Sequence, residues 1–206
     1  MMFTKRNRFN CFQLEFSYKN NNIMKYHSLI TTVIIILLSQ IVAYPNFLAA
    51  QSQRVAAVGD TAPNFSLVDF QGKKFTFDKK KNDKVRVFWF TNLCSGCQSV
   101  ILDMEKIKSW YEKKNVEVVA VSQLGEDRAT VERIIKEKKL TIRFLYDPKG
   151  EATSLYSGRY IPGTCPLKSL YIVQRNGTIQ YANHFPGAPG IEIVKQIDKA
   201  LAEKKN

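Results

Sequence analysis

The sequence predicts an α/β fold, in which a central mixed sheet is flanked by helices and carries an amino-terminal β-hairpin extension. Segments rich in β-branched and aromatic residues alternate with amphipathic helical segments of roughly 10–18 residues. The chain has 206 residues, of which 45% are hydrophobic, so it can bury a real core and is neither disordered nor fibrous. Only residues 29–43 approach the apolarity of a membrane span, which excludes a multi-pass membrane protein.

The first half of the fold is predicted to contain the hairpin, a buried strand and a long helix. Residues 62–67 and 74–77 are short strands joined by a turn at residues 70–73. Residues 85–90 (VRVFWF) are typical of a strand that is buried on both faces. A helix is expected from Cys97 to about residue 114, with an inner face made by Val100, Ile101, Met104, Ile107 and Trp110.

The second half continues the alternation and closes with another hairpin and a helix. Its strands are expected at residues 116–121, 142–145, 170–173 and 178–182. Its helices are expected at residues 127–138, 151–156 and 191–204. The first of these helices is expected to bury Val131, Ile134 and Ile135, and the last to bury Ile191, Val194, Ile197 and Leu201. Asn176-Gly177, between the last two strands, is a strong signal for a hairpin turn.

The first 50 residues are predicted to be targeting sequence rather than fold. Residues 1–23 form a polar, basic extension, and Met24 offers an alternative start. Residues 24–50 combine a short basic start, an apolar run and small residues up to Ala50, as in a secretory signal peptide. The same segment also fits an uncleaved membrane anchor. In either case we expect an exported protein with a linker at residues 51–57 and one domain at residues 58–206.

The chain is basic, with a formal net charge of +13 at pH 7. From residue 51 onward it has 26 Lys and Arg against 17 Asp and Glu, and the basic residues lie in charge-mixed helical stretches and in one run, Lys79-Lys80-Lys81. A nucleic-acid-binding face needs clustered basic residues with interleaved aromatic residues, which this pattern lacks. We therefore expect a solvated basic surface and no nucleic-acid partner.

The chemistry is predicted to lie at Cys94-Ser95-Gly96-Cys97, which follows a buried strand and opens a helix. The unpaired backbone N–H groups and the positive dipole end of a helix stabilise a thiolate at this point. Cys94 is therefore expected to have a depressed pKa and to attack disulfides. Cys97, one turn further on, is expected to resolve the resulting mixed disulfide by attacking Cys94.

Two other roles for this pair of cysteines fit the sequence less well. A zinc site needs a second pair of cysteines or a pair of histidines at suitable spacing, and none follows. A purely structural disulfide that closes a two-residue loop adds little stability. We therefore expect a redox-active disulfide, with neither a resident metal nor a cofactor.

Three stretches, VGDTAPNFSLVDFQGKKFTF, VFWFTNLCSGC and SLYIVQRNGTI, resemble the redoxin branch of the thioredoxin superfamily. This branch contains the alkyl hydroperoxide reductase/thiol-specific antioxidant (AhpC/TSA) group and the exported thiol–disulfide oxidoreductases. The resemblance spans residues 58–204. It implies a thioredoxin fold, with Cys94 as the nucleophile and Cys97 as the resolving thiol.

The chain departs from two patterns of this superfamily around the cysteines. Peroxiredoxins place a proline and then a threonine ahead of the peroxidatic cysteine; Thr91 matches the threonine, but Val87 stands at the proline position. The basic residue expected before the late strand is Lys168 rather than an arginine. Thioredoxins place a cis-proline at the position of Lys168, whereas Pro166 lies two residues earlier. The resemblance therefore makes Thr91, Pro166 and Lys168 candidate supporting residues.

Cys165 precedes the late strand and has three interpretations. It is a small buried apolar residue, as free cysteines often are, a third redox thiol beside Cys94 and Cys97, or the third member of a thiolate set for Cu(I). His184 is expected to be a structural residue, because nothing pairs with it in the sequence. Trp89 is expected to lie in the core, where it can also flank the disulfide.

The sequence therefore predicts an exported thiol–disulfide oxidoreductase that exchanges disulfides with partner proteins through Cys94 and Cys97. Two alternatives stay open. One is a thiol peroxidase in which Cys94 is oxidised by peroxide, and the other is a copper-binding chaperone that uses Cys94, Cys97 and Cys165. The expected partners are protein thiols and disulfides, peroxide in the first alternative, and the membrane where residues 24–50 remain attached.

Overall fold

The structure is a computed structural model that describes residues 54–203, apart from residues 124–126, 159, 162, 186 and 189. The described residues belong to one compact unit of the chain. The predicted extension at residues 1–23 and the signal or anchor at residues 24–50 lie outside the described residues, so these segments and their boundaries stay predictions. Within the described residues, no helix combines the length and the apolarity needed to cross a membrane.

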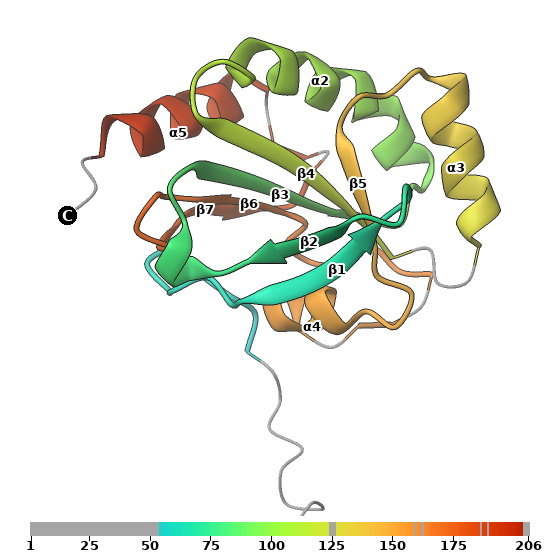
Figure 1. Cartoon of the computed structure of the whole chain (residues 1–206), viewed down its shortest axis with the longest axis horizontal. Helices are drawn as coiled ribbons and strands as arrows, with labels where there is room; N and C mark the ends of the chain where they lie inside the picture. Colours follow the sequence, from blue (N-terminus) through green and yellow to red (C-terminus); the bar gives the residue numbers. More distant parts are fainter. Residues whose placement is uncertain are drawn as a thin grey trace, which may run out of the picture. The chain divides into compact units, whose positions relative to one another are not determined.

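The centre of the fold is a mixed sheet of seven strands in the order β2-β1-β5-β4-β3-β6-β7 (Figure 1). The strands are β1 (Phe65–Asp69), β2 (Lys74–Phe77), β3 (Val85–Thr91), β4 (Val116–Ser122), β5 (Arg143–Tyr146), β6 (Leu170–Val173) and β7 (Ile179–Asn183). β4 runs parallel to both β3 and β5, whereas the other neighbouring strands are antiparallel. The predicted fold class, with its amino-terminal hairpin, is confirmed.

Helices cover both faces of this sheet (Figure 1). They are α2 (Ser95–Tyr111), α3 (Arg128–Glu137), α4 (Glu151–Ser157) and α5 (Gly190–Ala202), with a short 3-10 helix η1 (Lys79–Lys81) after β2. The chain steps from β3 to β4 to β5 in one direction across the sheet, and right-handed crossovers place α2 and α3 on the same face. α5 joins them there, while α4 packs on the opposite face.

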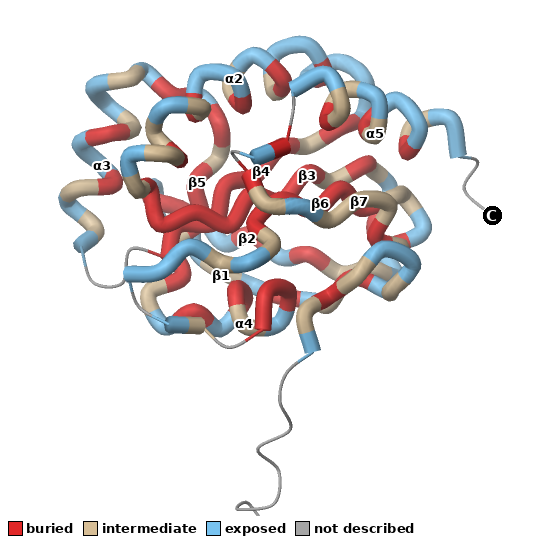
Figure 2. Tube along the Cα trace, turned by 180° about the vertical axis from the view of Figure 1, so that it is seen from behind, coloured by how far each residue is buried: buried red, intermediate tan, exposed pale blue. Residues whose placement is uncertain are grey.

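The two central strands, β3 and β4, are buried along almost their whole length (Figure 2). Alternate residues of β3 enter different cores: Val87 and Trp89 face the side of α2, and Phe88 and Phe90 face the side of α4. Each strand carries one charged residue, Arg86 in β3 and Glu117 in β4, and these two residues are register partners that form an ion pair. The pairing lets both charges stay partly buried, because an unpaired charge at this depth is strongly destabilising.

The hairpin is attached to the sheet by aromatic packing and by one buried carboxylate. The ring of Phe65 packs edge-on against that of Phe88, with ring centroids 5.2 Å apart. Asp69 accepts hydrogen bonds from the N–H groups of Gln71 and Lys73 and from Nε of Arg143 on β5. This carboxylate therefore closes the turn and joins the hairpin to the neighbouring strand β5.

Several predicted boundaries and faces need correction. β1 begins at Phe65 rather than at residue 62, because Pro63 has no N–H to donate to a strand ladder. Trp110, which was expected on the inner face of α2, is 59% exposed, whereas Tyr111 is buried with its hydroxyl donated to Asp198. Ile191 is 83% exposed, because the buried stripe of α5 runs along its other side, through Ile193, Ile197 and Ala200. The other predicted strands agree within one residue.

Candidate active site

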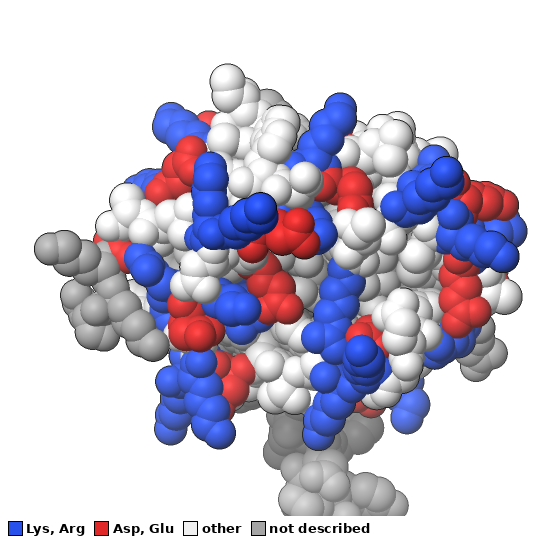
Figure 3. Space-filling model, turned by 45° about the horizontal axis from the view of Figure 1, so that its top comes forward, with Lys and Arg blue, Asp and Glu red and all other residues white. Residues whose placement is uncertain are grey.

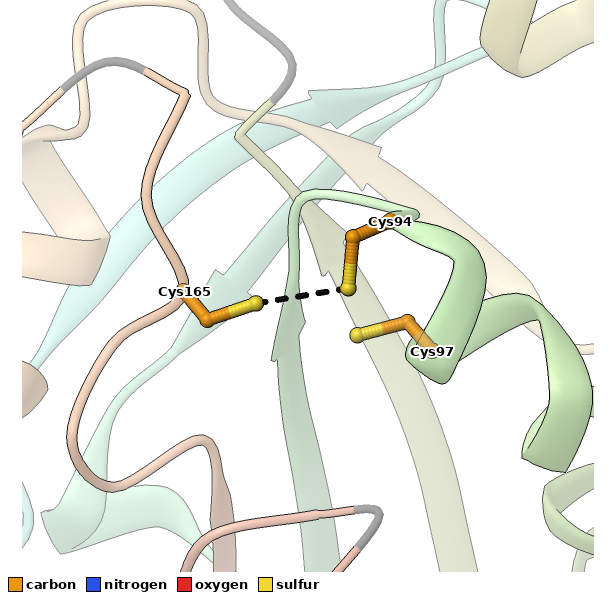
Figure 4. A group of neighbouring side chains, drawn as sticks. All are labelled: Cys94, Cys97 and Cys165. Carbon is orange, nitrogen blue, oxygen red and sulfur yellow. Dashed lines mark hydrogen bonds between the residues drawn. The ribbon is translucent and has the colours of Figure 1, made fainter.

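Three cysteines meet at the carboxyl end of β3 (Figure 4). Cys94 and Cys97 come from the amino end of α2, and Cys165 comes from the loop before β6. Because β6 is antiparallel to β3, its amino end lies beside the carboxyl end of β3, and this brings the loop to the helix. The three sulfur atoms point toward one another and lie within 4.8 Å of one another, and all three are free thiols. The sulfurs of Cys94 and Cys165 are 3.4 Å apart.

A tight turn between β3 and α2 places Cys94 at the start of the helix. The side-chain oxygen of Asn92 accepts the backbone N–H of Cys94 at 3.1 Å, which makes an Asx turn. Leu93 has a φ of +51°, in the left-handed region, so the chain reverses direction at this residue. The Leu93 carbonyl accepts a hydrogen bond from the side-chain amide of Gln98 at 2.8 Å, which ties the turn to the first turn of α2.

The surroundings of Cys94 favour its thiolate. Partial burial acts to raise the pKa of Cys94, but the backbone N–H of Cys97, the thiols of Cys165 and Cys97 and the backbone N–H of Gly96 outweigh it and hold that pKa below its ordinary value. The two N–H groups belong to the unpaired donors at the amino end of a helix. The start of α2 therefore supplies the backbone N–H donors from which the sequence predicts a reactive thiol at Cys94.

The other two thiols favour their protonated forms. Cys97 is 2% exposed, and burial raises its pKa to about 12 although the nearby Thr91 hydroxyl acts in the opposite direction. Partial desolvation of the sulfur and the neighbouring Cys94 raise the pKa of Cys165. Cys165 is an exposed residue, so its interpretation as a small buried apolar residue is wrong.

Asn92 is a site residue that the sequence analysis missed. It is 8% exposed, and its side-chain oxygen also accepts the Cys165 thiol at 3.2 Å and lies 3.9 Å from the sulfur of Cys97. The backbone N–H of Cys94 can only donate, so it fixes the amide with its oxygen toward the sulfurs. This shared acceptor links the loop that carries Cys165 to the turn before α2. An asparagine two residues before the first cysteine was an available signal for the Asx turn.

The remaining predicted supporting residues flank the sulfur cluster. The carbonyl oxygen of Pro166 lies 3.1 Å from Nδ1 of His184, so this histidine holds the loop in the structural role expected of it. The carbonyl of Lys168 accepts the hydroxyl of Ser157 at 2.6 Å. These contacts position the loop that carries the third cysteine.

Tyr160 anchors the same loop at its other end. The Tyr160 hydroxyl donates to the carbonyl oxygen of Gln123, the residue after β4, at 2.8 Å. Its ring lies over Gly150, at the place where any side chain at that position would begin. Gly150 also has a φ of +65°, which glycine adopts without strain. The loop is therefore held between the end of β4 and the start of α4.

β3 positions three further residues that the sequence analysis named. Trp89 is fully buried and packs edge-on against Phe185 at 5.5 Å, as a core residue. Thr91 is buried, and its hydroxyl accepts the N–H of Leu93 at 3.0 Å. Val87 lies in the middle of β3 with pairing partners on both β4 and β6. A proline at this position would remove a backbone N–H from the centre of the sheet.

The face shown in Figure 3 has intermingled Lys, Arg, Asp and Glu side chains. Four ion pairs in α2, α3 and the residue that follows α2 show this mixing at the level of single residues: Lys106–Asp103, Lys108–Glu112, Arg128–Glu132 and Arg133–Glu137. Such exposed pairs contribute little stability. Each pair does neutralise its own two charges locally.

Comparisons with known proteins match the domain that carries the cysteines. The sequence model of the AhpC/TSA family matches residues 58–182. The thiol-disulfide oxidoreductase ResA of Geobacillus thermodenitrificans is 27% identical over 150 residues, which cover 72% of this chain and 82% of that protein. A solved structure from Bacteroides thetaiotaomicron, assigned as a protein disulfide isomerase, has a TM-score of 0.62 at 19% identity and covers 72% of this chain and 92% of its own. Another from Chlorobium tepidum, assigned as the thiol:disulfide interchange protein DsbE, has a TM-score of 0.59 at 25% identity and covers 71% of this chain and 99% of its own.

Proposed function

Because the chain belongs to the AhpC/TSA family, in the redoxin branch of the thioredoxin superfamily, and is a thiol–disulfide oxidoreductase, we propose that Cys94 and Cys97 exchange disulfides with partner proteins. The Cys94 thiolate attacks a partner disulfide, forms a mixed disulfide and releases one partner sulfur as a thiolate. Cys97, after losing its proton, attacks the sulfur of Cys94 and releases the second partner thiolate. The partner disulfide is reduced by two electrons, and the two cysteines are oxidised to a disulfide.

One observation carries this proposal: the two thiols of the pair have opposite environments. Cys94 is half-buried at the start of α2 with a lowered pKa, so it can meet a large partner as a thiolate. Cys97 is buried in the first turn of the same helix, so a partner protein cannot reach it, although the sulfur of Cys94 can. This asymmetry fits a division of labour between an attacking thiol and a resolving thiol.

The test is the rate of exchange between the reduced chain and a small protein that contains a disulfide. Cys94→Ser is expected to lower the second-order rate by about 100-fold or more, because a serine hydroxyl is not ionised at neutral pH. Cys11→Ser is the matched control, since Cys11 belongs to the predicted extension at residues 1–23. Exchange at the original rate in Cys94→Ser would contradict the proposal.

We also propose that the domain is exported by residues 24–50. The support is the order of a short basic start, an apolar run and small residues in the sequence. The test is a fusion of residues 1–57 to a reporter enzyme that becomes active only outside the cytoplasm. An active reporter that is lost in Ile35→Lys is expected, because a lysine interrupts the apolar run. An inactive fusion would overturn the export proposal and leave the redox proposal intact.

The sulfur cluster favours a second candidate function, the binding of Cu(I). A metal held by three thiolates at about 2.3 Å needs sulfur atoms roughly 4 Å apart, and the three sulfurs lie within 4.8 Å of one another. Thiolates are soft ligands that suit Cu(I). The test is competition with a chelator of Cu(I), in which the reduced chain retains the metal and both Cys94→Ser and Cys165→Ser lose it. Complete transfer of copper from the original chain to the chelator would eliminate this candidate.

The peroxidase alternative stays a prediction. The hydroxyl of Thr91, the residue that matches the peroxidatic pattern, accepts the backbone N–H of Leu93 in the turn, and the carbonyl of Lys168 accepts the hydroxyl of Ser157. Its test is the rate at which hydrogen peroxide consumes the Cys94 thiol. A rate well above that of free cysteine supports the alternative, and a rate equal to it removes the alternative.

A further inference from the structure

The third thiol is the feature of the site that the proposed exchange cycle does not use. The sulfur of Cys165 lies 3.4 Å from that of Cys94, which is contact distance for two sulfur atoms. Either sulfur can be the donor in this contact. Cys165 therefore already faces the atom that a resolving thiol has to attack.

Solvent exposure distinguishes the thiol of Cys165 from that of Cys97. Cys97 is 2% exposed, so its thiol has little contact with the water that would accept its proton. Cys165 is exposed, so less desolvation opposes its ionisation and a water molecule can accept its proton. The nucleophile in thiol–disulfide exchange is the thiolate, which favours the more exposed sulfur.

The loop holds Cys165 in place for such an attack. The Cys165 thiol donates to the side-chain oxygen of Asn92 at 3.2 Å, and this asparagine also binds the backbone N–H of Cys94. The next residue, Pro166, is held through its carbonyl oxygen by His184. The sulfur of Cys165 is therefore positioned against Cys94 without a partner protein.

We propose that Cys165 is a second resolving thiol, which attacks the Cys94 sulfur of the mixed disulfide and passes the disulfide on to Cys97; the inference rests on the proposed function. In the first step Cys165 loses its proton to water, the Cys165–Cys94 bond forms, and the bond from Cys94 to the partner sulfur breaks. The partner leaves as a thiolate. In the second step the Cys97 thiolate attacks Cys94 and releases the Cys165 thiolate, which takes up a proton. Cys165 is thus regenerated, and the two electrons that reduce the partner come from Cys94 and Cys97.

The test uses the reduced full chain, with Cys11→Ser in every variant, and one equivalent of Ellman's reagent. The first thionitrobenzoate released reports attack on the reagent, and the second reports resolution. Four forms are compared: the background chain, Cys97→Ser, Cys165→Ser, and the double variant Cys97→Ser with Cys165→Ser. We expect Cys97→Ser to release the second thionitrobenzoate about tenfold or more faster than the double variant. A non-reduced digest of Cys97→Ser is expected to contain the peptide pair joined by Cys94 and Cys165.

Each outcome has a distinct meaning. If Cys97→Ser stalls as the double variant does, with the label retained on Cys94, the relay is overturned while the proposed function stands. If Cys165→Ser resolves as fast as the background chain and no Cys94–Cys165 peptide pair forms in Cys97→Ser, the relay is also overturned. Cys94→Ser measures direct reaction of the reagent with Cys165; a first release as fast as that of the background chain would overturn the proposed function itself. The melting temperature of each variant confirms that it is folded.

Discussion

The substitution Asn92→Asp changes the charge near the three sulfurs and keeps the shape of the site. Aspartate has nearly the same size as asparagine, and its carboxylate can still accept the backbone N–H of Cys94 that Asn92 accepts at 3.1 Å. The turn into α2 is therefore retained. The change adds one negative charge beside the sulfur cluster, and this charge opposes the formation of a thiolate on Cys94.

The size of the effect follows from the distances in the site. The sulfur of Cys94 lies 3.4 Å from that of Cys165, which lies 3.2 Å from the side-chain oxygen of Asn92, so at most about 6.6 Å separate this oxygen from the Cys94 sulfur. A unit charge at that distance is worth about 0.6–2.5 kcal/mol for effective dielectric constants between roughly 80 and 20. The pKa of Cys94 is therefore expected to rise by about 0.5–2 units.

The assay is the rate of Cys94 alkylation by iodoacetamide as a function of pH, with the modified cysteine identified by mass spectrometry. The rate is proportional to the thiolate fraction, so its midpoint reports the pKa of Cys94. Asn92→Ala is the control, because it removes the amide oxygen without adding charge. A Cys94 midpoint that does not move in a folded Asn92→Asp variant would refute the placement of this side chain among the sulfurs. A shift of equal size in Asn92→Ala would refute the electrostatic explanation.

Three further predictions concern the frame that holds the site. Tyr111→Phe removes the hydroxyl that joins α2 to Asp198 on α5 at 2.7 Å, and urea unfolding should show a loss of about 1 kcal/mol; an unchanged midpoint at an unchanged slope would contradict this. Burial acts to raise the pKa of Asp69, but the backbone N–H of Lys73 and the guanidinium of Arg143 outweigh it and lower that pKa. Because the folded pKa lies below the unfolded one, this stabilisation is present above the ordinary carboxyl pKa and is lost as the pH falls toward the lowered one; Asp69→Asn should flatten that acid limb in unfolding titrations. Val87→Pro is expected to destabilise the fold by about 3 kcal/mol or more in urea unfolding, so an unchanged midpoint at an unchanged slope would contradict the assignment of Val87 to a central strand.

The strands and the hairpins could be predicted from the sequence because their signals are local. The run VRVFWF has no polar face, which is typical of a central strand, and Asn176-Gly177 determines the tight turn between β6 and β7. The helix faces were harder to predict. Trp110 and Tyr111 are neighbours on α2, and a shift of the buried face by one residue decides which of them is buried. Tyr111 is buried because Asp198, far along the chain, accepts its hydroxyl. That partner is invisible to helical periodicity.

The part of the candidate site that depends on local signals could also be predicted from the sequence. The position of Cys94 at the start of a helix is a local property, and so is the first turn that contains Cys97. The contact of Cys165 with Cys94 spans a large separation in sequence and depends on the antiparallel placement of β6 beside β3. The sequence could therefore offer three interpretations of Cys165, and the exposed position of the residue removes one of them.

Tyr160 packs over Gly150, and its segment leads to Cys165. A substitution at residue 150 can therefore alter the chemistry of the sulfurs although residue 150 touches none of them. A methyl group at residue 150 would push the tyrosine ring aside, and the displaced segment leads directly to Cys165. Such a variant keeps every cysteine and the whole Cys-Ser-Gly-Cys motif. Two chains with identical motifs can therefore differ in redox behaviour, and an alignment restricted to the cysteines would group them together.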